Sequence, residues 1–215
     1  IGKWMKMEKE ITLLTSVGSA ICGAAAILGA ESTIKSKPYQ TAVAISTVVI
    51  FGTISMFLYP VLYRNGIVDL TPDQMGIYTG STLHEVAHVV GAGNAMGKEI
   101  SDVGIIVKMI RVIMLVPALL AEGGKSKITI PWFALGFLAV IGFNSFDLLP
   151  QPAISFINDF DTFLLTMAMT ALGAETSIEK FKKAGVKPFL LASFLYIWLL
   201  AGGYLLVRYI TPYFV

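Results

Sequence analysis

The chain has 215 residues, of which 55% are hydrophobic and 14% are charged, and its formal net charge is +2. Soluble domains carry about 25% charged residues, so this composition excludes an ordinary soluble globular protein. The small positive excess gives no reason to expect nucleic acid as a partner. The single cysteine, Cys22, excludes an internal disulfide. We therefore expect an all-α membrane protein surrounded by the lipid bilayer.

Five stretches are long and apolar enough to cross a bilayer, which takes about 20 residues. They are residues 41–62, 103–121, 128–146, 160–174 and 188–210. The connections between them are short and are marked by proline and glycine. The sequence thus predicts one multi-span transmembrane domain over residues 1–215. Because residues 1–10 are charged, lack a signal-peptide layout and do not begin with methionine, we expect the chain to start in a loop of a longer protein.

Two further stretches, residues 13–30 and 76–95, are long enough to enter the membrane but are broken by glycines and small polar residues. They also resemble each other, because residues 18–22 (GSAIC) align without gaps on residues 80–84 (GSTLH). Each is followed by a short charged loop and an apolar span. The pattern indicates a weak internal repeat of one discontinuous or re-entrant helix plus one span.

The distribution of lysine and arginine predicts the orientation of the later spans. Residues 147–161 contain no lysine or arginine and residues 175–187 contain four lysines, so the second loop is expected to be cytoplasmic. The count does not decide whether the two broken segments cross the membrane or return to the face from which they entered. A re-entrant arrangement would give the two repeats opposite orientations, as in many secondary transporters.

The string His84-Glu85-Val86-Ala87-His88 contains both histidines of the chain and matches the zinc motif H-E-x-x-H. On one continuous helix the two imidazoles would share a face, which predicts an intramembrane zinc metalloprotease as one alternative. Such enzymes need a third ligand from a later span. The nearest candidate is Asp147, which lacks the following glycine of the usual motif. We therefore expect no metal and no other cofactor.

A second interpretation of this string follows from the cost of charge in a bilayer, which makes buried ionisable groups functional candidates. Glu85 can pair with His84 or with a cation of the next span. Lys108 and Arg111 are three residues apart, so they are neighbours on one helix face. Such a cluster suits a proton relay or an anion site. The alternative is that the two cations extend from one end of their span to the membrane surface.

The first broken segment has small side chains at Ser19, Ala20 and Gly23, which allow a close approach to its backbone. A helix interrupted here would expose unpaired N–H groups, and such helix ends bind anions inside membranes. The alternative is a face of small residues for helix packing. Cys22 is expected to be a small core residue, because no histidine lies near it in the sequence.

Five segments together resemble the YeiH-like family of bacterial inner-membrane proteins, which is assigned to sulfate export. They are residues 19–26, 48–53, 80–87, 108–112 and 125–133. The resemblance implies a secondary transporter of the cation–proton antiporter and bile-acid transporter type, with inverted repeats and discontinuous helices. Family members are longer, with further spans at the N-terminus. His84 and Glu85 match the family motif, whereas His88 departs from it, because glutamine occurs there in family members and would not serve as a zinc ligand.

Together these features predict a multi-pass protein of the bacterial inner membrane that exports a small anion, sulfate or a related oxyanion or sulfonate, with protons as a candidate coupling ion. The expected proton-coupling residues are His84 and Glu85. The expected substrate-binding residues are Ser19, Ala20, Ile21, Cys22, Gly23, Gly80, Ser81, Thr82, Lys108 and Arg111. Assembly is left open, with a homo-oligomer as one option. The alternatives are the zinc protease and a structural membrane subunit without a transport pathway.

Overall fold

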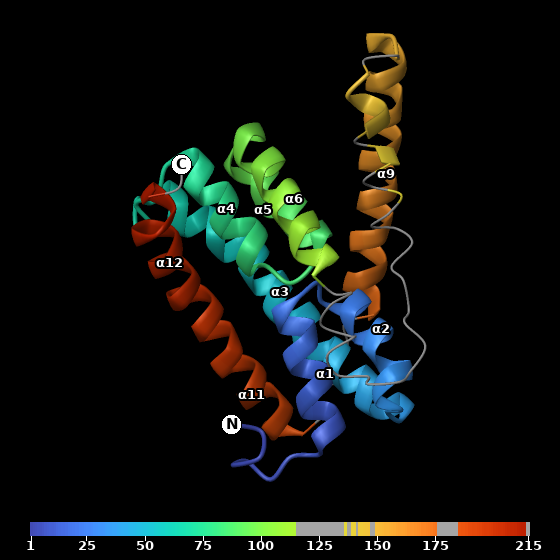
Figure 1. Ribbon diagram of the computed structural model, residues 1–215, viewed down its shortest axis with the longest axis vertical. Coiled ribbons are helices and arrows are strands. Elements are labelled where there is room, and N and C mark those ends of the chain that lie inside the picture. Colours follow the sequence, from blue (N-terminus) through green and yellow to red (C-terminus); the bar gives the residue numbers. More distant parts are fainter. Residues whose placement is uncertain (115–135, 137–138, 141, 147–148, 176–184, 214–215) are drawn as a thin grey trace.

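The computed structural model describes residues 1–114, 136, 139–140, 142–146, 149–175 and 185–213, and it contains only helices and their connections within these ranges (Figure 1). Parts of the predicted spans 103–121 and 128–146 therefore lie outside the described residues. The helices are α1 (Lys9–Ala20), α2 (Ala24–Ile34), α3 (Pro38–Arg64), α4 (Pro72–Thr82), α5 (Val86–Met96), α6 (Lys98–Ile113), α9 (Gln151–Glu175), α11 (Val186–Ile197) and α12 (Gly203–Tyr209). A π-helical turn, Trp198–Gly202, joins α11 to α12.

Two helices among the described residues are long and apolar enough to cross a membrane, Pro38–Arg64 and the run Val186–Tyr213. They overlap the predicted spans 41–62 and 188–210. Pro38 opens α3, where its fixed φ suits the first helical turn and its missing N–H removes no helix bond. The Gln40 side chain accepts a hydrogen bond from the Lys37 N–H at 2.7 Å, which completes the start of this helix.

Helices α1 and α2 form the first hairpin, residues 9–34, whose tip is the break at residues 21–23. Gly23 has φ +67°, a conformation that residues with a side chain rarely adopt, and it turns the chain between the two helices. The open end of the hairpin is closed by Glu8. Its carboxylate accepts hydrogen bonds from Tyr39 Oη at 2.6 Å and from Gln40 Nε2, in the helix that follows α2. Both ends of this hairpin therefore lie at the start of α3.

Helices α4 and α5 form the second hairpin, residues 72–96, with its tip at residues 83–85. Helices α4 and α6 run parallel to each other, because Gly76 lies against Val103 and Gly80 lies against Val107. The start of α4 therefore lies beside the start of α6. Because α6 begins directly after α5, the end of α5 lies there as well. The Arg64 guanidinium, at the end of α3, donates to the Ala95 carbonyl. The second hairpin therefore opens at the opposite end of α3 from the first.

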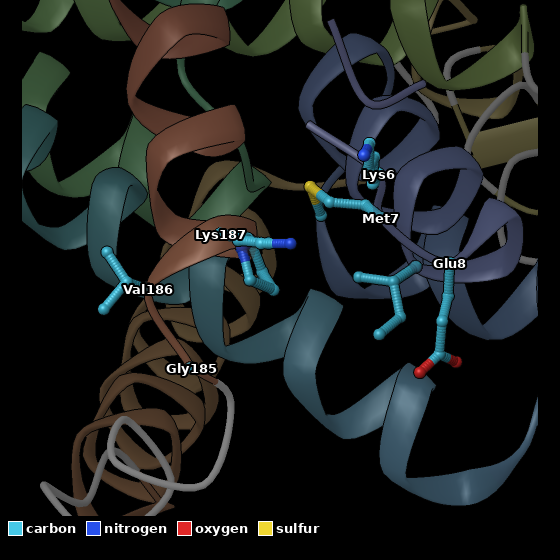
Figure 2. A pocket seen from close by; sticks show the side chains of 8 residues that line it. Lys6, Met7, Glu8, Gly185, Val186 and Lys187 are labelled. Carbon is cyan, nitrogen blue, oxygen red and sulfur yellow. The ribbon is translucent and has the colours of Figure 1, made fainter. Parts of the chain in front are cut away.

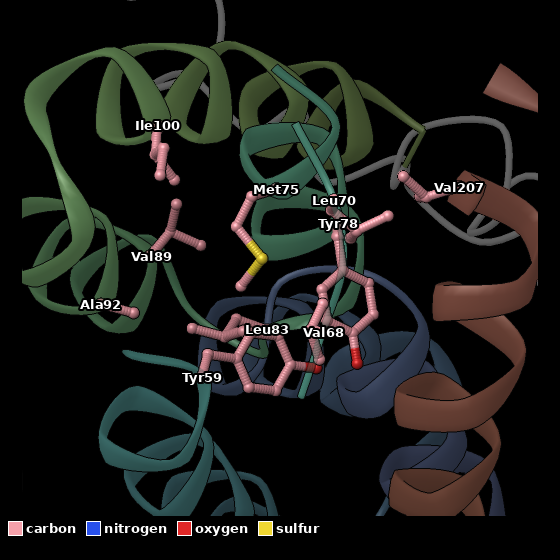
Figure 3. Close-up of a cluster of buried hydrophobic side chains, with 10 residues drawn as sticks. All are labelled: Tyr59, Val68, Leu70, Met75, Tyr78, Leu83, Val89, Ala92, Ile100 and Val207. Atoms are coloured by element: carbon pink, nitrogen blue, oxygen red, sulfur yellow. The ribbon is translucent and has the colours of Figure 1, made fainter. Parts of the chain in front are cut away.

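The core consists of two clusters of buried apolar side chains. One surrounds the first hairpin and includes Leu14, Ile27 and Val48. The other surrounds the second hairpin and is shown in Figure 3. In it the rings of Tyr59 and Tyr78 are stacked, with centroids 4.8 Å apart. Many large apolar side chains instead point outward, as expected for helices that contact lipid; they include Phe57, Ile106, Ile110, Phe160, Trp198 and Leu205.

Candidate functional site

The tips of the two hairpins meet at two cations on α6. The Lys108 Nζ donates to the Ile21 carbonyl at 3.0 Å and to the Leu83 carbonyl at 2.5 Å. The Arg111 guanidinium donates through Nε to the Ala20 carbonyl at 2.7 Å, through one terminal nitrogen to the Leu83 carbonyl at 2.8 Å, and through the other to the Ser19 carbonyl. Lys108 and Arg111 thus join both tips through backbone carbonyls.

These carbonyls are the groups that a helix leaves unpaired at its C-terminal end. The last four C=O groups of a helix lack intrahelical partners, and the helix dipole is negative there. The ends of α1 and α4 both point at the cations of α6, so each receives positive charge where its dipole is negative. This explains why Lys108 can be fully buried, at 0% exposure.

Glu85, at the tip of the second hairpin, contacts the first hairpin at the N-terminus of α2, where the helix dipole is positive. The Ala24 N–H, in the first turn of α2, donates to Glu85 Oε1 at 3.2 Å. A carboxylate is favourable at a helix N-terminus for the same electrostatic reason that favours a cation at the other end. Gly23 makes room for it, because a Cβ at this position would lie 2.5 Å from Cγ of Glu85.

His88, which departs from the family motif, also lies beside Glu85. Its Nδ1 lies 3.7 Å from Glu85 Oε2, and its Nε2 lies 3.5 Å from the Thr53 hydroxyl on α3. The ring is packed against Gly52, where a Cβ would lie 2.5 Å from it. His84 is also buried, at 1% exposure, and its Nδ1 has no hydrogen-bond partner among the described residues. The spacing of three residues between Glu85 and His88 could have indicated this pairing.

The start of α5 differs from the start of α2. The first N–H groups of any helix have no intrahelical partner, and in α5 they belong to Val86, Ala87 and His88. No side chain among the described residues caps them. The guanidinium of Arg111 carries five N–H donors, and the three hydrogen bonds described above leave two of them without a partner among the described residues. Unused donors therefore remain at the junction of the tips.

Several of the predicted binding residues contribute groups other than the backbone amides that were expected. Ser19 and Ala20 lie in the last turn of α1 and contribute carbonyls, while Ile21 and Cys22 are buried in the first core cluster. Gly23 contributes space for a side chain of the other hairpin.

Gly80, Ser81 and Thr82 lie in the last turn of α4. Gly80 packs against the Gly104 carbonyl, and the two hydroxyls donate back to the Tyr78 carbonyl at 3.2 and 2.5 Å. Residues 19–20 and 80–82 thus lie within helices that end at the breaks, whereas the amides at the starts of α2 and α5 follow the breaks.

The zinc interpretation required both histidines on one helix face, and this expectation is wrong. Glu85 has an extended backbone (φ −123°, ψ 156°), and α5 begins only at Val86. His84 therefore precedes the helix that carries His88. Among the described residues no three His, Cys, Asp or Glu side chains lie close enough to hold a metal ion. Asp147, the predicted third ligand, lies outside the described residues.

A groove of about 500 Å³ lies far from this junction, at the open end of the first hairpin (Figure 2). It is lined by the start of α1 and the start of α11, with Lys6, Glu8 and Lys187 at its edges. The groove is open to the surface and contains none of the residues predicted to bind or couple.

The formal charges at the junction leave an excess of one positive charge among the described residues. Lys108 and Arg111 contribute two cations and Glu85 one carboxylate, with the histidines counted as neutral. A charge buried in an apolar bundle is costly unless it is compensated. The arrangement is therefore suited to take up a single negative charge.

Residues 1–192 match the family described as "Conserved hypothetical protein 698". A UPF0324 membrane protein of Bacteroides thetaiotaomicron is 69% identical over 99% of this chain. The UPF0324 inner membrane protein YeiH of Escherichia coli K12 is 47% identical over 92% of the chain, and a UPF0324 membrane protein of Pseudomonas aeruginosa is 45% identical over 94%. No solved structure matches.

The chain spans 68% of the length of the Bacteroides relative and 60% and 62% of the Escherichia coli and Pseudomonas proteins. The names of these relatives state a location in the membrane, which for the Escherichia coli protein is the inner membrane. These matches confirm the resemblance to YeiH-like proteins and the expected location in the bacterial inner membrane. The chain belongs to the Conserved hypothetical protein 698 family of membrane proteins, UPF0324.

Proposed function

We propose that this protein is a secondary transporter that moves a small anion, sulfate or a related oxyanion or sulfonate, across the inner membrane. The observation that carries the proposal is the meeting of two hairpin tips, from opposite ends of α3, at the buried side chains of Lys108 and Glu85 and the half-buried side chain of Arg111. In a membrane both hairpins would be re-entrant, and each with its following span would form one half of an inverted repeat. Secondary transporters bind substrates at such interrupted helices near the bilayer midplane.

The anion would bind at the start of α5. The N–H groups of Val86, Ala87 and His88 lack a side-chain cap among the described residues, and a helix N-terminus attracts negative charge. The Arg111 nitrogen that donates to the Leu83 carbonyl, three residues before this helix, has one further N–H, and the nitrogen that donates to the Ser19 carbonyl has another. Guanidinium groups suit oxyanions because their planar donors match two oxygens at once. A sulfonate, with one negative charge, would then neutralise the excess positive charge of the junction, and sulfate, with two, would need one proton on Glu85 or a histidine as well.

Proton coupling would depend on Glu85 and the two histidines. Glu85 bridges the hairpins through Ala24, and His88 lies 3.7 Å from its carboxylate. Histidine changes its charge near physiological pH, so this pair is suited to take up and release a proton. Protonation of Glu85 would weaken its electrostatic hold on the start of α2 and change how the tips interact. His84, buried beside the same tip, is the second candidate carrier.

Two alternatives are separated from this proposal by measurement. A structural subunit without a pathway would bind no anion at the junction. A zinc protease would bind stoichiometric metal through His84 and His88, and elemental analysis of the purified protein measures this directly. The interrupted helix at Glu85 gives no support to the second alternative.

The test is flux through the purified full-length protein in proteoliposomes. Radiolabelled sulfate and a panel of oxyanions and sulfonates are measured for the wild type, for Arg111→Gln and for Arg208→Gln. Arg208 forms an exposed ion pair with Asp69 at 2.8 Å, remote from the junction, and serves as the matched control. We expect saturable flux of at least one anion, lost in Arg111→Gln and retained in Arg208→Gln. Absence of flux for the whole panel, or full flux in Arg111→Gln, would contradict the proposal.

A further inference from the structure

Lys108 has an unusual set of partners for a buried ammonium group. It is fully buried, and among the described residues its hydrogen bonds go to two backbone carbonyls and to no carboxylate. Buried lysines are rare and are normally paired with an acid. The nearby acid, Glu85, is engaged by the Ala24 N–H instead. The ammonium is therefore coordinated as a small cation would be, by neutral oxygens.

These oxygens come from both interrupted helices. Ile21 lies in the break of the first hairpin and Leu83 in the break of the second. In secondary transporters, carbonyls at unwound segments and at the C-terminal ends of half-helices are the groups that coordinate a coupling sodium ion. The tip of the first hairpin also carries the buried hydroxyl of Ser19. This oxygen has no hydrogen-bond partner among the described residues. The junction has the oxygen donors of a monovalent cation site, and Lys108 fills it.

We infer that the Lys108 ammonium is a built-in cation that takes the place of a dissociable sodium ion. Transport by this protein would then not require sodium, and removal of the ammonium would create a sodium site. The statement about transport rests on the proposed function, whereas the statement about cation binding does not. Arg111 occupies the neighbouring carbonyls of Ser19 and Ala20, so the oxygens left to a cation in the absence of the ammonium are those that Lys108 now contacts.

The test of binding is thermal unfolding of the detergent-solubilised full-length protein in sodium chloride and in choline chloride. The variants are Lys108→Ser, which removes the charge and leaves a hydroxyl, and Lys108→Arg, which keeps the charge. The matched control is Lys98→Ser, at the exposed start of the same helix. For Lys108→Ser we expect Tm to rise saturably with sodium, by about 3 °C at roughly ten times the Kd. The wild type, Lys108→Arg and Lys98→Ser should unfold at equal temperatures in the two salts.

The outcomes separate the inference from the proposed function. Sodium-dependent stabilisation of the wild type, or a folded Lys108→Ser without it, would overturn the inference. If Lys108→Ser does not fold, Lys108→Gln takes its place, since it keeps most of the volume and supplies an amide oxygen. In proteoliposomes, wild-type flux should be equal in sodium and choline, and a sodium requirement would also overturn the inference. If the proposed function is wrong, the proteoliposomes should show no anion flux in either sodium or choline, which is a different result from a sodium requirement.

Discussion

Replacement of Gly23 by alanine tests whether the contact between the two hairpins is as close as described. Gly23 has φ +67°, and a Cβ there would lie 2.5 Å from Cγ of Glu85. The backbone conformation costs an alanine about 1–3 kcal/mol. Displacement of the carboxylate from the Ala24 N–H loses a hydrogen bond to a charged group, worth about 1.5–3 kcal/mol. The expected loss in the free energy of unfolding is therefore about 3–6 kcal/mol.

The matched control for this prediction is Gly66→Ala. Gly66 has nearly the same φ, +66°, but no described atom lies within 4 Å of the position that a Cβ would occupy. It should show only the cost of the backbone conformation. At about 2–4 °C per kcal/mol, Tm should fall by about 6–24 °C in Gly23→Ala and by about 2–12 °C in Gly66→Ala, in thermal unfolding of the solubilised protein, with the larger fall in Gly23→Ala. An equal fall in both variants would refute a direct contact between Gly23 and Glu85.

Three further predictions concern the carboxylates and one close packing contact. Glu85→Gln keeps an oxygen for the Ala24 N–H but exchanges no proton, so anion flux should lose its dependence on pH between pH 5 and 8, measured in proteoliposomes. Gly52→Ala should displace the His88 ring and destabilise the protein by about 1–3 kcal/mol, measured as a fall in Tm. Hydrogen bonds from Tyr39 and Gln40 lower the pKa of Glu8 below its ordinary 4.5. The stability from this contact is present above pH 4.5 and is lost as the pH falls through the lowered pKa. Tyr39→Phe removes the larger cause and should raise the pKa of Glu8, measured by NMR titration.

The controls for these predictions use sites without the corresponding contact. Gly202→Ala meets only ordinary contacts, at 3.5 Å and beyond, and should leave Tm nearly unchanged. Glu99→Gln, at an exposed position on α6, should leave the pH profile of flux unaltered. A Glu85→Gln protein that keeps the wild-type pH profile would remove this carboxylate from the coupling reaction.

The sequence predicted the class of the protein and the places where its helices break. Composition excluded a soluble domain, and the small residues around Gly23 and Ser81 indicated two interrupted segments, which the helix ends at Ala20 and Thr82 match. The spacing of Lys108 and Arg111 predicted two neighbouring cations, and both donate to the tips. These features depend on local composition and helix periodicity, which a single sequence displays directly.

The polarity of each break could not be predicted in the same way. An interrupted helix exposes carbonyls on one side of the break and amides on the other, and the neighbouring side chains do not indicate which set will face a cation. That choice depends on contacts between distant parts of the chain, such as Glu85 with Ala24 and Arg111 with Ser19. His84 and His88 were expected on one helix face because the extended backbone at Glu85 leaves no clear trace in a string that matches a helical motif.

The contacts between the hairpin tips have a consequence for how substitutions will act on this protein. Each hydrogen bond described there joins a charged side chain to a backbone group, at Ser19, Ala20, Ile21, Leu83 or Ala24. A backbone partner survives most changes of its own side chain. The information that joins the tips is thus concentrated in the three charged residues and in Gly23. Ser19, Ile21 and Leu83 are restricted by their burial in the core, whereas Ala20 is exposed and is free to vary in size and polarity. In a library of variants, Ala20 should therefore be tolerant of substitution although its carbonyl accepts a hydrogen bond from Arg111.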